Sequence, residues 1–102
     1  IDGDSDNDVD TTHEEVDAHR IIQAIAAELV DVDRIVMRDA KSYCAIIFDD
    51  NNRKPIARLH FNKKKLAFGV FVGKEEQKFD IEKLSEIYKH KTLILQSVQQ
   101  YV

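Results

Sequence analysis

The spacing of apolar side chains changes along the chain from a helical period to a strand period and back. Near the start, apolar residues recur every three or four positions at Ala18, Ile21, Ile22, Ile25 and Leu29. This period is typical of one buried face of a helix. Thr12 followed three residues later by Glu15 matches a capping box. We therefore predict a helix that starts at the Thr12 cap and runs to about Val30.

The middle of the chain reads as strands. Four runs rich in Ile, Val and Phe follow one another at 34–39, 43–49, 55–62 and 66–72, and 77–79 adds a short fifth. Their short connections predict antiparallel neighbours. The clearest pair is a hairpin from Tyr43 to Asn62, which we expect to turn through the six residues 49–54. Its Asp and Asn residues tolerate left-handed backbone.

The last quarter returns to helical spacing. Asp80 is the predicted cap of a helix that carries Ile81, Leu84, Ile87 and Tyr88. A segment at 91–102 presents Ile94, Val98 and Tyr101, and the pattern leaves open whether these are one helix or two. A helix, a run of strands and a helix predict an α+β two-layer sandwich. The expected sheet is antiparallel with four to five strands, and both terminal helices pack on one face.

Alternation along the predicted hairpin separates two faces of the sheet. One face is apolar and should lie under the helices; it comprises Cys44, Ile46, Phe48, Ala57, Leu59 and Phe61. The other mixes aromatic, aliphatic and basic groups; it comprises Tyr43, Ala45, Ile47, Ile56, Arg58, His60 and Asn62, and Arg38 joins it from the first strand. Three interpretations of this second face stay open: a solvated surface, a contact with another domain or a twin chain, and a nucleic-acid surface.

Charge changes this picture, because it is unevenly distributed. The net charge is -4, yet residues 1–17 hold eight of the 19 acids and none of the 15 Lys and Arg residues, which leaves 18–102 at +4. We interpret residues 1–11 as an acidic flexible linker and 12–102 as one domain. Residues 34–65 carry nine basic and three acidic side chains. Such a basic stretch favours a polyanionic partner.

The single cysteine and the lack of long apolar runs bear on the compartment. Cys44 has no internal partner for a disulfide, and a lone Cys in an apolar run fits a buried thiol in a reducing, cytoplasmic setting. No apolar run approaches the roughly 20 residues that span a bilayer, so no membrane contact is expected.

Candidate catalytic groups are few. Asp39-Ala40-Lys41 and Glu76-Gln77-Lys78 each give the carboxylate–spacer–lysine order of metal-dependent nucleases, but such triplets arise by chance in a chain that is 33% charged. His60 has no carboxylate at a spacing that predicts a pair, and the three glycines are too dispersed for a phosphate loop. We therefore expect no complete catalytic site, no metal site and no cofactor in this domain.

Three strings carry a family resemblance: residues 38–43 (RDAKSY), 49–62 (DDNNRKPIARLHFN) and 81–90 (IEKLSEIYKH). Together they resemble the C-terminal part of bacterial and phage restriction endonucleases with a type I restriction R-subunit N-terminal-like domain. The resemblance runs from about Thr12 to Tyr101. It implies an upstream nuclease-like domain of the same polypeptide, whose catalytic motif is not among these residues. Cys44 departs from the aromatic residue that the resemblance leads us to expect.

These observations give one leading hypothesis and two rivals. The leading one is an accessory DNA-binding module whose predicted contacts are Arg38, Lys41, Tyr43, Asn51, Asn52, Arg53, Lys54, Arg58, His60, Asn62, Lys63, Lys64 and Lys65. Basic side chains would meet phosphates, while Tyr43 and the amides would stack or hydrogen-bond. The first rival is a non-catalytic module that docks on the nuclease domain or forms a homodimer. The second is a degenerate nuclease that uses Asp39 and Lys41.

Overall fold

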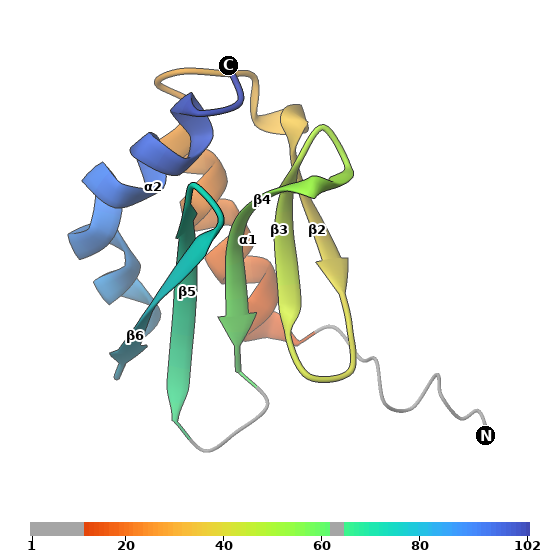
Figure 1. Ribbon diagram of the computed structural model, residues 1–102. Helices are drawn as coiled ribbons and strands as arrows, with labels where there is room; N and C mark the ends of the chain where they lie inside the picture. The colour runs from red at the N-terminus through yellow and green to blue at the C-terminus, as the bar shows by residue number, and fades with distance from the viewer. Residues whose placement is uncertain (1–11, 62–64) are drawn as a thin grey trace.

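The predicted sandwich is confirmed in a computed structural model, which describes residues 12–61 and 65–102 (Figure 1). Helix α1 (His13–Ala26) leads through a short 3₁₀-helix, η2 (Val32–Arg34), into the sheet. The strands are β2 (Ile35–Asp39), β3 (Cys44–Phe48), β4 (Asn51–His60), β5 (Leu66–Val72) and β6 (Glu75–Ile81). The 3₁₀-helix η3 (Leu84–His90) and helix α2 (Lys91–Gln99) complete the fold. The proposed linker at 1–11 lies outside the described residues.

The sheet is a meander in which every strand pairs antiparallel with its neighbours, in the order β2-β3-β4-β5-β6. Figure 1 shows α1 and α2 on the same side of it. Apolar residues of both helices, such as Ile22 and Ile94, join Leu59 and Phe68 of the sheet in one buried core. The opposite side of the sheet has no helix over it among the described residues. No described helix is both long and apolar enough to cross a membrane.

Helix α1 begins as predicted and ends earlier. The Thr12 hydroxyl accepts from the Glu15 N–H at 3.2 Å, and the Glu15 carboxylate accepts from the Thr12 N–H at 3.0 Å, which completes the capping box. The helix ends at Ala26, and beyond it the N–H groups of Glu28 and Leu29 bond three residues back, to the carbonyls of Ile25 and Ala26, in a turn. Leu29, which we expected on the buried stripe, is therefore exposed.

The central hairpin turns more tightly than predicted. Phe48 pairs with Asn51, so the turn consists of Asp49 and Asp50 alone, both in the left-handed region with φ of 55° and 56°. Two left-handed residues make the turn type that matches strand twist. Arg34 donates two hydrogen bonds to the Asp49 carboxylate, and Arg38 donates two to that of Asp50, at 2.5–2.8 Å. Those hydrogen bonds lower the pKa of Asp49 and of Asp50.

A bulge in β4 corrects one face assignment. Ile46 pairs with Ala57 but Ile47 pairs with Pro55, so Ile56 has no partner in β3. The extra residue turns the Ile56 side chain into the core, where it is fully buried. Our placement of Ile56 on the second face was therefore wrong. Cys44, also fully buried, lies on the helix side as predicted.

The C-terminal segment differs in its start. Asp80 lies within β6 and caps no helix. The Glu86 carboxylate does the capping instead, since it accepts from the N–H groups of Glu82 and Lys83 at 2.7 and 2.9 Å. Tyr88, which we expected in the apolar stripe, is exposed. The sequence left open whether this segment is one helix or two. It is two helical elements without a gap, because the 3₁₀-helix η3 ends at His90 and α2 begins at Lys91.

Candidate functional site

The face of the sheet that faces away from α1 and α2 is called the open face here. Strand register places on it residues from all five strands: Val36, Arg38, Ala45, Ile47, Arg58, His60, Ala67, Gly69, Phe71, Glu76, Lys78 and Asp80, with Tyr43 just before β3. Ile47, Ala67 and Phe71 are buried in it, at 2%, 7% and 7% exposure. The exposed members are charged: Arg38, Lys78 and Asp80.

Arg58 sits at the centre of the open face between two aromatic rings. Its guanidinium carbon lies 4.5 Å from the centroid of the Tyr43 ring and 5.0 Å from that of Phe71. Nη1 of Arg58 lies 3.9 Å from Oε1 of Glu76, an ion-pair distance that is too long for a hydrogen bond. Within residues 12–61 and 65–102, the Tyr43 and Phe71 rings thus hold the Arg58 guanidinium, and its N–H donors stay available for hydrogen bonds to a ligand. Its side chain is 38% exposed.

Glu76 and His60 form a second contact beside Arg58. Nε2 of His60 lies 2.7 Å from Oε2 of Glu76, and the two side chains are 19% and 21% exposed. They come from β4 and β6, which are separated by β5. They meet because β5 has Gly69 between them, and a Cβ there would collide with the Glu76 side chain. Sequence spacing predicted no carboxylate partner for His60, and that prediction was wrong.

Two depressions flank the Tyr43–Arg58 pair. One, of about 380 Å³, is lined by Ser42, Tyr43, His60, Lys65, Ala67, Lys78 and Asp80. The other, of about 300 Å³, is lined by Tyr43, Ala45, Ile47, Asn52, Pro55, Ala57 and Arg58. Both have volumes at the low end of the range for small-ligand sites, about 300–1,000 Å³. The open face is therefore a shaped surface with hydrogen-bonding groups at its hollows.

The structure brings together only part of the predicted contact set. Tyr43, Asn52, Arg58, His60 and Lys65 line the two depressions. Asn62, Lys63 and Lys64 lie outside the described residues.

The other predicted contacts lie around the edge of the sheet or in existing interactions. Arg38 is held by Asp50, and the Asn51 carboxamide oxygen accepts from the Arg53 N–H at 2.9 Å. Lys54 lies 5.8 Å from the ring of the core residue Phe48. Arg53 is exposed on β4, and Lys41 is exposed in the loop that joins β2 to β3.

The sequence did not lead us to the members of the open face that belong to β5 and β6: Ala67, Gly69, Phe71, Glu76, Lys78 and Asp80. Pairing of the two strands sets Phe71 opposite Glu76 and Gly69 opposite Lys78. The signal was the alternation of Glu76, Lys78 and Asp80, which share one parity. It was obscured because we predicted only 77–79 as strand.

A second cluster of titratable groups is buried on the helix side. A carboxylate oxygen of Glu15, a carboxylate oxygen of Asp39 and Sγ of Cys44 all lie within 4.8 Å of one another. Burial raises the pKa of Glu15, and the charge of Asp39 and a hydrogen bond to it raise it further. Burial and the same acids raise the pKa of the Cys44 thiol to about 12. Cys44 is thus a neutral thiol, as expected for a buried cysteine, and Asp39 has a carboxyl neighbour that the sequence did not suggest.

Replacing Glu15 with Gln should stabilise the protein at neutral pH. The raised pKa of Glu15 means that the folded state binds its proton more tightly than the unfolded state does. This contribution is complete below the unfolded pKa and is lost as pH rises through the folded pKa. Gln keeps an oxygen for the Thr12 N–H and adds an N–H for Asp39, and it has no charge to desolvate. We expect a gain of about 1 kcal/mol at pH 7.

Urea denaturation of both forms at pH 4 and pH 7 measures this effect. The difference between Glu15→Gln and wild type should grow with pH. Glu14→Gln, one residue away and exposed, is the matched control and should show no such growth. A Glu15→Gln protein that is less stable than wild type at pH 7 would contradict the assignment of Glu15 as a buried carboxyl whose pKa is raised.

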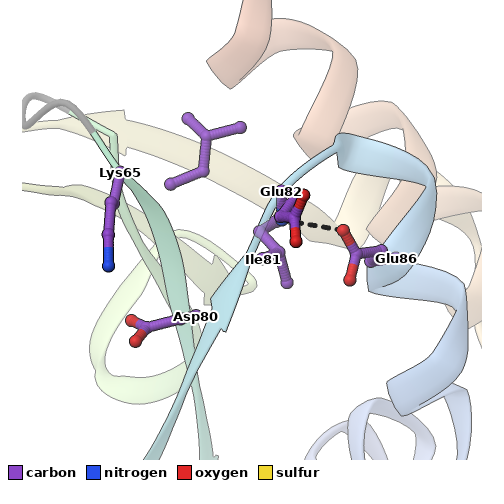
Figure 2. Close-up of a pocket in the computed structure, with 6 residues that line it drawn as sticks. Lys65, Asp80, Ile81, Glu82 and Glu86 are labelled. Carbon is purple, nitrogen blue, oxygen red and sulfur yellow. Dashed lines mark hydrogen bonds between the residues drawn. The ribbon is translucent and has the colours of Figure 1, made fainter.

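Another depression, of about 530 Å³, lies at the end of β5 and β6 and shares Lys65 and Asp80 with the first one described above (Figure 2). Figure 2 shows Glu86 hydrogen-bonded to Glu82, across the depression from Lys65 and Asp80. The Glu86 carboxylate accepts from the N–H groups of Glu82 and Lys83, so its Oε2 already has partners in the chain.

Comparisons of the chain with family models, with curated proteins and with solved structures gave no match. The resemblance to restriction endonucleases therefore stays a prediction from the sequence.

Proposed function

We propose that this chain is a nucleic-acid-binding module that contacts DNA through its open face. The single observation that carries the proposal is Arg58: two aromatic rings hold its guanidinium, and among the described residues its nearest carboxylate, Glu76, stays at 3.9 Å, beyond a hydrogen bond. A guanidinium prepared in this way suits a phosphate, because its planar fork can bind two oxygens at once. Lys65 and Lys78 line the adjoining depression and add positive charge. The sequence resemblance supports the context of an accessory module in a restriction-type endonuclease.

The main alternative, docking on a protein or on a second copy, has less support. Interfaces that hold protein chains together have apolar centres. The large hydrophobic residues that are exposed in the described chain are Leu29, Val32, Tyr88 and Val102, none of which is on the open face. The polar, partly cationic open face is better matched to a polyanion.

The proposal is tested by binding to labelled DNA over a range of salt concentrations. Phosphate contacts by three cations, Arg58, Lys65 and Lys78, predict a slope of about -2 to -3 when the logarithm of the duplex binding constant is plotted against the logarithm of the salt concentration. Lys78→Gln should make the slope shallower by about one unit. Lys89→Gln removes a charge that is also exposed, from η3 on the helix side, and should leave the slope unchanged. No binding at about 50 mM salt, or equal effects of the two variants, would contradict the proposal.

A further inference from the structure

The shape of the open face bears on which form of nucleic acid it takes. A duplex presents two phosphate rails and hides its bases, so it is bound by broad cationic surfaces or by elements that enter a groove. In the described part of the open face, Glu76 and Asp80 lie among the cations, so the positive charge is not continuous. The Arg58 site itself is formed by strand residues, Tyr43 and Phe71, and no described helix lies over it.

The two depressions instead have the dimensions and chemistry for unstacked bases. They lie on either side of the Tyr43–Arg58 pair and share Tyr43 as a wall. One offers His60, Ser42 and Lys78 to a base edge, and the other offers the Asn52 amide. Bases become available for such contacts only in single strands, where they can stack on aromatic side chains and hydrogen-bond at their edges.

We infer that the open face binds single-stranded nucleic acid, with successive bases in the two depressions and the intervening phosphate on Arg58. This inference rests on the proposed function and narrows it to one class of ligand. Tyr43 lines both depressions, and Arg58 lines one of them with its guanidinium 4.5 Å from the Tyr43 ring. A phosphate on Arg58 therefore lies beside the wall that the two depressions share and can join a nucleotide in each. The Glu76 carboxylate orients His60. Its negative charge also repels phosphates from β6.

The test is a fluorescence anisotropy titration of the full chain with three probes of equal length, about 12 nucleotides. They are a single strand, the same sequence as a duplex, and an abasic strand that keeps the phosphates and lacks the bases. At one salt concentration, the single strand should bind at least about tenfold more tightly than either of the others. This comparison needs no variant and so does not depend on the folding of a mutant.

A matched pair of variants locates the bases. Tyr43→Ala should weaken single-strand binding about tenfold and abasic-strand binding by clearly less, because Phe71 still contacts the Arg58 guanidinium. Tyr88→Ala removes an exposed tyrosine from η3, on the helix side, and should change neither.

The outcomes distinguish failure of the single-strand inference from failure of the proposed nucleic-acid binding. Duplex bound as tightly as the single strand, or abasic strand bound as tightly as both, would overturn the single-strand inference while the proposed function stands. Absence of binding to all three probes would overturn both. Self-association in sedimentation without DNA binding would favour the protein-docking alternative.

Discussion

Gly69→Ala is expected to destabilise the protein by about 2 kcal/mol, although alanine is normally the better residue in a strand. A Cβ at this position would lie 2.5 Å from Cδ of Glu76 and closer still to its Cγ and Oε2. The Glu76 side chain would have to leave, and its 2.7 Å contact with His60 would be lost. Urea denaturation gives the cost directly.

A double-mutant cycle shows whether the cause is the collision with Glu76. In the Glu76→Ala background the added methyl group has room, so Gly69→Ala should there be neutral or slightly stabilising. Gly73→Ala is the control, because Gly73 has φ of 68° and no atom within 4 Å of its added Cβ. Its cost arises in the backbone and should be the same in both backgrounds. A Gly69→Ala cost that is unchanged by Glu76→Ala would refute the packing account.

Arg58→Ala is expected to reduce affinity for single-stranded DNA by roughly 10- to 100-fold. The estimate follows from losing a charged hydrogen-bonding group, worth about 1.5–3 kcal/mol. Arg58 can act at this strength because Tyr43 and Phe71 already fix its guanidinium, so little ordering remains to be done on binding. Arg58→Lys keeps the charge but loses the planar fork, so its affinity should fall between those of wild type and Arg58→Ala.

Arg38 offers a contrast on the same face. Its guanidinium is held by Asp50 through two hydrogen bonds, of 2.7 and 2.5 Å. A phosphate would have to displace that carboxylate, whose own charge would then repel it. Arg38→Ala should therefore weaken binding by only about twofold, through the loss of long-range attraction.

Much of the fold was predictable because its signals are local. The Thr12 capping box and the alternation of Cys44, Ile46 and Phe48 each depend on neighbouring residues, and the structure confirms both. The division of the hairpin into a core side and an open side followed from this alternation. Tyr43, Arg58 and His60 were found in this way.

The bulge could not be read from the sequence. Whether Ile56 points into the core depends on the two-residue turn at Asp49 and Asp50, which starts β4 at Asn51 and leaves extra residues to be absorbed. That turn uses arginines from before and within β2, more than ten residues away. Alternation alone assumes an unbroken ladder, and so it placed Ile56 on the wrong face.

The Glu76–His60 contact was hidden for a different reason. It spans two strand pairings, β4 with β5 and β5 with β6, and it requires a residue without a side chain between the partners. Gly69 reads in the sequence as an isolated glycine in an apolar run. Its role becomes evident only when both neighbours are in register.

The central claim is that the open face is organised around Arg58 to bind nucleic acid. Its most direct test is the affinity of Arg58→Ala and of Arg38→Ala for one single-stranded oligonucleotide at one salt concentration, since each variant removes one guanidinium from this face. The account predicts a loss of roughly 10- to 100-fold for Arg58→Ala and about twofold for Arg38→Ala. Equal losses would indicate undirected electrostatic attraction, and unchanged affinity in Arg58→Ala would contradict the claim.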